Sequence, residues 1–323
     1  MKSLTNGQIY KKLMPLYLVG FLIDLVAIAI LIGGATAGFF VGGEGDNALI
    51  GLVIGLLVGA VLVVIYHIFV GNLFHSAVVA MMQKAIVRGE IETPVIANGL
   101  RMAKSRFSSI TGFFFISSAI RGAFRQIGRV ITGVGRRFGG DAGQAVGSIL
   151  DSAVQTLIGY LSDCCLAWVF YRENLSMGKA ALEGAAIFFK HGKTFAQNAG
   201  RIFGMGLLSL LVIGGALFGI SYAIVYFNPN LIQLLATEIG NAMASTEGGA
   251  PDFLTNPTTL GLITSAIGAL IIWSPLHALF VKPFILIGVM KNFMKTGMEN
   301  LPTAQEIGDV TSRAPKLARL ENK

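Results

Sequence analysis

Charged side chains interrupt several long apolar stretches of this sequence, and they are the residues best placed to do chemistry. They are the aspartates Asp24, Asp151 and Asp163 and the arginines Arg121, Arg125 and Arg129. An ionisable group inside a membrane-spanning segment is costly, so it marks a pairing or functional site. The arginines are spaced four residues apart and therefore share one stripe of a helix.

Three interpretations of these charges remain open. Aspartate–arginine pairs would hold helices in register. In the second interpretation, the arginines reach anionic lipid headgroups. In the third, an ion or proton passes along a path beside Asp163. At a rise of about 1.5 Å per residue, Asp163 and Arg121 lie at depths that a long arginine side chain can bridge. The pairing interpretation therefore predicts that Asp163 pairs with Arg121, and that Asp151 pairs with Arg125 or Arg129.

The histidines and cysteines lack the spacing of a metal site. His67 and His75 are eight residues apart, and Cys164 and Cys165 are adjacent, so they point in different directions on a helix. A protein metal site needs roughly three or four clustered ligands. We therefore expect no metal and no cofactor, and we interpret these histidines and His277 as makers of hydrogen bonds between helices.

Sequence patterns of catalysis are also missing. The chain contains no G-x-x-x-x-G-K-[ST], no H-E-x-x-H and no G-x-S-x-G. We therefore expect no catalytic residues and no enzyme activity. The formal net charge is +8, and the basic residues fall in loops predicted to face anionic lipid headgroups. Membrane lipids are thus the expected partner, and nucleic acid is not.

The composition shows what kind of scaffold must position these residues. Of the 323 residues, 54% are apolar and only 13% are charged, which excludes an ordinary soluble domain. A membrane-spanning helix needs roughly 20 mostly apolar residues. The sequence predicts an all-α, polytopic transmembrane bundle with about six spans, near residues 16–41, 49–81, 107–131, 145–171, 202–227 and 259–290.

Segment 107–131 is the ambiguous span, because its second half carries the arginine stripe. If it crosses, there are six spans, and Arg136 and Arg137 lie outside against the usual charge distribution. If it lies in the inner interface instead, 145–171 must enter and leave on the same side. We favour the crossing, because it leaves 145–171 a continuous helix with Trp168 at an interface.

The distribution of basic residues in the loops predicts the orientation. Loops 42–47 and 228–258 carry acids and no base, whereas the N-terminus, residues 82–106, residues 172–201 and the end of the chain are basic. Because basic loops stay cytoplasmic, both termini are predicted inside. The first span resembles a secretory leader, but it is long and contains Asp24, so we expect it to remain uncleaved.

Helical spacing further predicts two interfacial amphipathic helices, at 176–189 on the inner side and at 231–243 on the outer side. The domain organisation expected is one transmembrane domain, 1–298, followed by a polar cytoplasmic tail, 299–323.

Glycines at four-residue spacing mark helix faces that allow close backbone approach. The two series singled out are Gly51, Gly55 and Gly59, and Gly135, Gly139 and Gly143. They indicate packing within one chain or, alternatively, contact between copies of the chain.

Residues 99–107 and 127–130, together with Glu173 ahead of the inner amphipathic helix, form a recognisable set. Over about residues 69–206 the chain resembles a family of bacterial and archaeal six-span membrane proteins of unknown function. More distantly, its layout is similar to that of choline transporter-like proteins. The chain departs from the family pattern at 168–171, which has no proline, and at Ala185, where serine is usual. The resemblance implies six spans and a prokaryotic cytoplasmic membrane, and it implies no activity.

Two functions remain after these exclusions. The favoured one is a structural or assembly subunit that packs with itself, as a homo-oligomer, or with partner membrane proteins. The alternative is a transporter or channel-like protein that moves an ion or small solute along a path near Asp163 and Arg121. The halves of the chain show no internal repeat of the kind common in secondary transporters, which favours the first.

Overall fold

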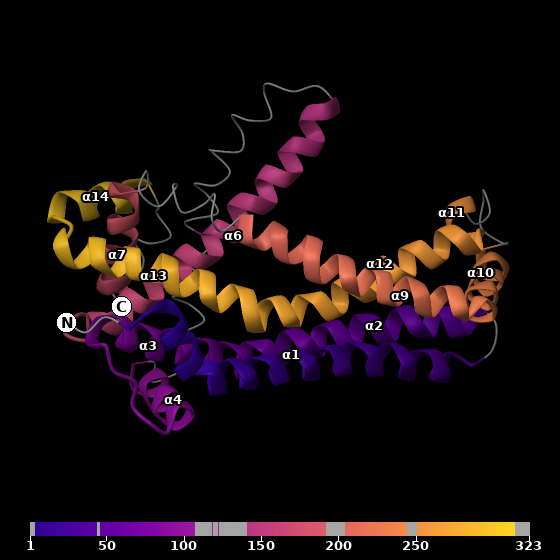
Figure 1. The fold of residues 1–323 in the computed structure, drawn as a ribbon, viewed down its shortest axis with the longest axis horizontal. Helices are drawn as coiled ribbons and strands as arrows, with labels where there is room; N and C mark the ends of the chain where they lie inside the picture. Colours follow the sequence, from indigo (N-terminus) through magenta and orange to yellow (C-terminus); the bar gives the residue numbers. More distant parts are fainter. Residues whose placement is uncertain are drawn as a thin grey trace. The chain divides into compact units, whose positions relative to one another are not determined.

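The computed structural model describes residues 4–43, 46–106, 118, 122, 141–191, 204–243 and 251–313. Every regular element within these ranges is a helix (Figure 1), which confirms the predicted all-α fold. The chain divides into two compact units. We call Phe21–Ile68 with Gly206–Val281 the apolar unit, and Met1–Gly20, Phe69–Met205 and Lys282–Lys323 the polar unit.

Four helical stretches among the described residues are long and apolar enough to cross a membrane. They are Asn6–Gly42, Ile50–Arg88, Gly204–Phe227 and Pro257–Glu299. These stretches contain most of the predicted spans 16–41, 49–81, 202–227 and 259–290. Their length and apolar composition are compatible with integration into a membrane.

The remaining two predicted spans have a different status. Span 145–171 corresponds to α6 (Asp141–Tyr171), but the apolar part of that helix is the shorter Ile158–Tyr171. Span 107–131 lies outside the described residues apart from Ser118 and Gly122. A total of six spans therefore stays a prediction.

The apolar unit consists of helices whose side chains are mostly large and apolar. Its elements are most of α1 (Asn6–Gly42), α2 (Asp46–Tyr66), the start of η1 (His67–Gly71), residues 206–209, η2 (Leu210–Gly214), α9 (Gly215–Phe227), α10 (Pro229–Met243), α11 (Asp252–Thr255), α12 (Pro257–Leu276) and η3 (His277–Val281). The 21 residues of α2 extend about 32 Å, close to a hydrocarbon core of roughly 30 Å. Leu57 on α2 and Leu211 on η2 are 60% and 65% exposed. Such an apolar surface requires a cover of lipid or protein.

A capping residue explains where α12 of the apolar unit begins. At the start of α12, Asn256 Oδ1 accepts hydrogen bonds from the backbone N–H groups of Thr258 and Thr259, and Pro257 occupies the first turn.

The predicted outer helix 231–243 is present as α10. Part of its apolar face is buried against α12, where Ile232 packs with Leu260.

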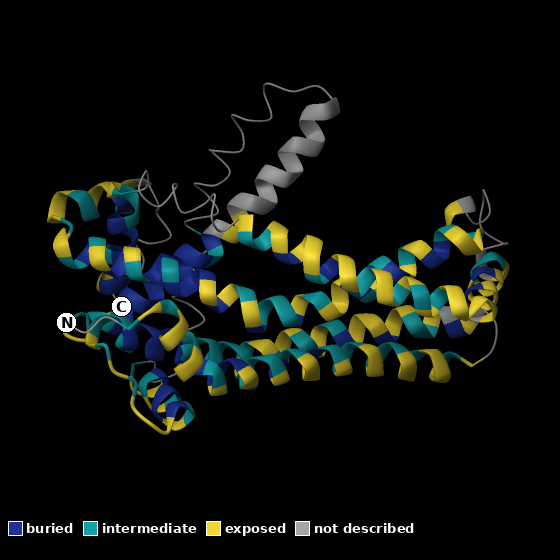
Figure 2. Cartoon of the chain, viewed as in Figure 1, coloured by how far each residue is buried: buried dark blue, intermediate teal, exposed yellow. Residues whose placement is uncertain are grey.

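The polar unit has a conventional buried core. It contains the start of α1, α3 (Asn72–Arg88), α4 (Val95–Arg106), α6, α7 (Met177–Lys190), α13 (Lys282–Glu299) and α14 (Ala304–Arg313). Trp168 of α6 is fully buried, and its ring meets that of Phe293 edge to face at 6.2 Å between centroids. Figure 2 shows the buried residues concentrated in α7 and the C-terminal half of α6.

Two parts of the polar unit differ from expectation. The helix predicted at 176–189 forms as α7, but Leu182 and Ile187 are buried in the core of the unit. Its apolar face is therefore covered by protein, because α6, α13 and α14 pack around it. The segment predicted as a polar tail, 299–323, contains α14, whose Val310 is buried. The domain boundary at residue 298 stays a prediction, although folded structure continues beyond it.

Candidate functional site

Asp163 forms a largely buried contact between ionisable side chains of the polar unit. Its Oδ1 lies 2.7 Å from Nε2 of His75, so α6 and α3 are joined by a hydrogen bond between side chains. The side chains of Asp163 and His75 are 6% and 25% exposed. A carboxylate bound in this way fixes the orientation of the imidazole ring. The contact has the interhelical character expected of the histidines.

The structure describes the other charged residues singled out by the sequence only in part. Arg121, Arg125 and Arg129 lie outside the described residues, so their predicted pairing with Asp163 and Asp151 stays a prediction. Asp151 belongs to α6, but its side chain is also outside the described set. Asp24 is half-buried on α1 and is close enough to Tyr66 of α2 to interact with it electrostatically.

Arg106 ties the end of α4 to the end of α6. Its Nε donates to the carbonyl of Val169, and its two terminal nitrogens donate to the carbonyls of Arg172, Glu173 and Leu175, over 2.8–3.2 Å. The last carbonyls of a helix have no intrahelical partner, and a planar guanidinium supplies several donors at once. Burial lowers the pKa of Arg106, and the neighbouring Glu173 opposes that shift. In the sequence, Arg106 belongs to the residues that carry the family resemblance and to a basic loop predicted inside, but the sequence predicts no bonding partner for it.

A second ion pair lies between α6 and α7. Glu183 accepts hydrogen bonds from Arg172 Nε at 2.8 Å and Nη2 at 3.1 Å, and from Trp168 Nε1 at 3.1 Å. The paired donors match the two carboxylate oxygens, which is the strong geometry for arginine. The Glu183 charge is therefore compensated within the protein.

In the apolar unit, a polar cluster joins Ser209, just before η2, to the end of α12 and the start of η3. Trp273 Nε1 donates to Ser209 Oγ at 3.2 Å, and Ser209 Oγ lies 3.2 Å from Nδ1 of His277. Because the serine accepts from an indole that can only donate, its own proton is free for the imidazole. Both η2 and η3 are five-residue π-helical turns, and such turns are frequent at functional sites.

Helices α1 and α2 lie side by side (Figure 1), and the glycine series on α2 faces the backbone of α1. A Cβ atom on Gly51 would lie 2.2 Å from the backbone oxygen of Gly38, and one on Gly55 would lie 2.1 Å from that of Gly34. Gly59 is less tightly packed, because a Cβ atom on it would lie 3.3 Å from its nearest neighbour, the backbone oxygen of Ile30. Real Cβ atoms do not approach backbone that closely, so α1 and α2 touch through their main chains.

The glycines of α1 are the residues that the sequence reasoning missed. Gly34, Gly38 and Gly42 are also spaced four residues apart, and that spacing was the available signal. By contrast, Gly135 and Gly139 lie outside the described residues, and Gly143 lies where α6 is described by its backbone alone.

Within the described ranges, no group of three or more histidine, cysteine, aspartate or glutamate side chains could hold a metal ion. Cys164 and Cys165 are free thiols, fully buried in α6. Comparison with protein-family models, curated proteins and solved structures gives no match for this chain.

Proposed function

We propose that this protein is a structural or assembly subunit of a membrane, held there by the helices of the apolar unit and packed with further copies of itself or with partner membrane proteins. The observation that carries the proposal is the contact of α1 with α2. Two helices whose main chains touch at Gly38 and Gly55 leave no room between them for water or solute.

The exposed surface of the apolar unit supports the same role. Large apolar side chains project from every long helix of the unit, among them Leu57 on α2, Leu211 on η2 and Ile267 on α12. Lipid would cover all of these faces in a monomer. In an assembly, at least one face is covered by another protein chain.

Site-specific crosslinking distinguishes these two states. A photoreactive amino acid is placed in turn at Leu57, Leu211 and Ile267 in cells, and Leu161, which is 1% exposed, serves as the buried control. The proposal predicts protein–protein crosslinks from at least one exposed position and none from the control. Purified protein should also have a mass above the 34.2 kDa of one chain. Lipid adducts alone from all three positions, with a monomeric mass, would overturn the proposal.

Transport of an ion or small solute along a path near Asp163 and Arg121 is the second candidate. The observation favouring it is the buried contact of Asp163 with His75, because a titratable pair is a common element of ion pathways. Purified protein in liposomes should then produce an ion flux that Asp163→Asn abolishes. An unchanged flux in that variant, or no flux above empty liposomes, would exclude this path.

A further inference from the structure

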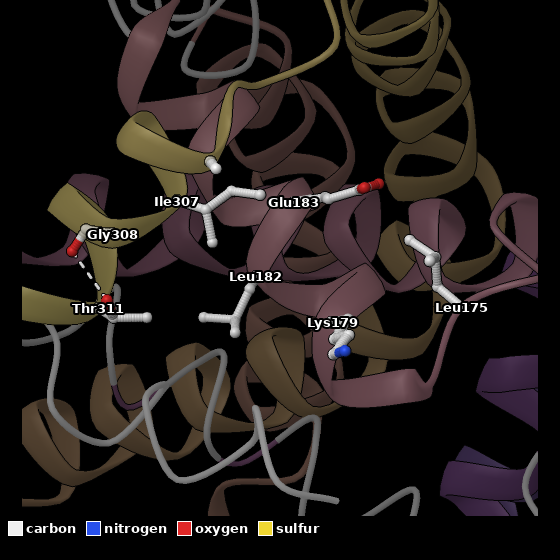
Figure 3. A pocket seen from close by; sticks show the side chains of 8 residues that line it. Leu175, Lys179, Leu182, Glu183, Ile307, Gly308 and Thr311 are labelled. Atoms are coloured by element: carbon white, nitrogen blue, oxygen red, sulfur yellow. Dashed lines mark hydrogen bonds between the residues drawn. The ribbon is translucent and has the colours of Figure 1, made fainter.

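The polar unit contains a pocket between α7 and α14 (Figure 3). Its volume is about 250 Å³, and its apolar walls are Leu175, Leu182, Ala304 and Ile307. Leu182 of α7 and Thr311 of α14 extend toward each other across it (Figure 3). Small-molecule sites usually have volumes of roughly 300–1,000 Å³, so this pocket suits one short chain and is too small for a two-chain lipid.

Charge at the pocket is positive and comes from one residue. Two ionisable side chains line the pocket, Lys179 and Glu183. The carboxylate of Glu183 points away from Ile307 (Figure 3) and is bound by Arg172. No described group accepts a hydrogen bond from the ammonium of Lys179. The first turn of α7 contains no acidic residue, and the helix dipole adds a partial positive charge at that N-terminal end.

We propose that this pocket binds a medium-chain fatty carboxylate. Its hydrocarbon chain lies between Leu182 and Ile307, and its carboxylate meets the ammonium of Lys179. Apolar walls stabilise the chain by removing it from water. The lysine then supplies a charge-assisted hydrogen bond that a neutral ester cannot accept as strongly. This site uses neither the glycine contact nor the Asp163–His75 pair, so it stands independently of the proposed function.

The first test fills the pocket from the α14 side. A Cβ atom on Gly308 would meet nothing within 4 Å, so Gly308→Leu is compatible with the helix while its side chain occupies the pocket. Gly7→Leu on α1 is the matched control, because Gly7 is exposed and also has open space around it. The probe is decanoic acid, titrated calorimetrically into purified full-length protein in amphipol. Saturable binding is expected for wild type and Gly7→Leu, with an affinity at least tenfold weaker for Gly308→Leu.

Equal binding by Gly308→Leu and wild type would overturn the proposal. If Gly308→Leu does not fold, as judged by circular dichroism, Ala304→Leu fills the same pocket and replaces it. Ala304 is exposed at the start of α14, so this substitution is compatible with the fold.

The second test addresses the carboxylate. Wild type should bind the acid about tenfold more tightly than its methyl ester, the difference expected for roughly 1.4 kcal/mol of one charge-assisted contact. Lys179→Gln should reduce that ratio to about one, whereas Lys104→Gln, which removes an exposed charge from α4, should leave it unchanged. Equal affinity of wild type for acid and ester, or an unchanged ratio in Lys179→Gln, would overturn the proposal.

Discussion

A methyl group on Gly55 would lie 2.1 Å from the backbone oxygen of Gly34 and 2.8 Å from the Cα atom of Gly38. Neither atom can move without shifting α1, because both belong to its backbone. The contact is thus more restrictive than one against a flexible side chain. It requires glycine at specific positions of both helices.

Gly55→Ala should destabilise the protein by roughly 1–3 kcal/mol, the usual cost of forcing extra atoms into a packed interface. Thermal unfolding in detergent measures the loss. Gly33→Ala is the control, because a Cβ atom there meets nothing within 4 Å. Gly59→Ala should have an intermediate effect, since its nearest backbone atom is 3.3 Å away. Equal stability of the Gly55 and Gly33 variants would show that α1 and α2 are not in main-chain contact.

Asp163→Ala and His75→Ala should each cost about 1–3 kcal/mol, because each removes the buried hydrogen bond between the two side chains. The double variant should lose less than the sum, since both substitutions remove the same hydrogen bond. Unfolding free energies of the four proteins provide the measurement. Additive losses would mean that the two side chains do not stabilise each other.

The same cycle with Arg121→Gln and Asp163→Asn tests the pairing predicted from sequence. If Arg121 also binds Asp163, these losses should be less than additive as well. Additive losses in this cycle would exclude Arg121 as a partner of Asp163.

The attachment of α14 should weaken in acid. Lys190 donates to the carboxylate of Glu306, and the backbone N–H of Thr303 donates to it as well, which together lower the pKa of Glu306. A carboxyl with a lowered pKa stabilises the folded state at pH values above its unfolded value, about 4.3. That contribution is lost as the pH falls through the lower folded-state pKa.

Amide hydrogen exchange of α14 between neutral pH and about pH 3 tests this effect of Glu306. Protection in wild type should decline in acid, and Glu306→Gln should begin lower and converge on wild type at low pH. Glu299→Gln, which removes an exposed acid of α13, should follow wild type. Parallel curves for Glu306→Gln and wild type would exclude the ion pair as the cause.

The orientation of the chain is testable with single cysteines. The wild-type protein should not react with an impermeant thiol reagent, because Cys164 and Cys165 are 0% exposed. Gln233→Cys on α10 should react in intact cells, since loop 228–258 is predicted to be outside. Asn174→Cys, between α6 and α7, should react only after permeabilisation. Labelling of Asn174→Cys in intact cells would contradict the predicted topology.

Features that depend on contiguous residues followed from the sequence alone. Length and apolar content predicted an all-α chain with about six spans, and four of those spans coincide with described helices long and apolar enough to cross a membrane. Helical periodicity predicted helices where α7 and α10 form. The spacing of Gly51, Gly55 and Gly59 indicated a close helix contact. These signals are local, because helix formation and the face that a residue occupies depend on neighbours within a few turns.

The identity of each contacting partner came only from the tertiary structure. His75 meets Asp163 across 88 residues of sequence, and Gly34 and Gly38 of α1 are the residues that receive the α2 glycines. Arg106 binds carbonyl oxygens at the end of α6 and just beyond it, and the apolar face of α7 is covered by other helices of the chain. Such pairings depend on the rotation and relative depth of packed helices. The pattern of a single helix specifies which face is apolar or small, but the helix that covers that face is selected by packing of the whole chain.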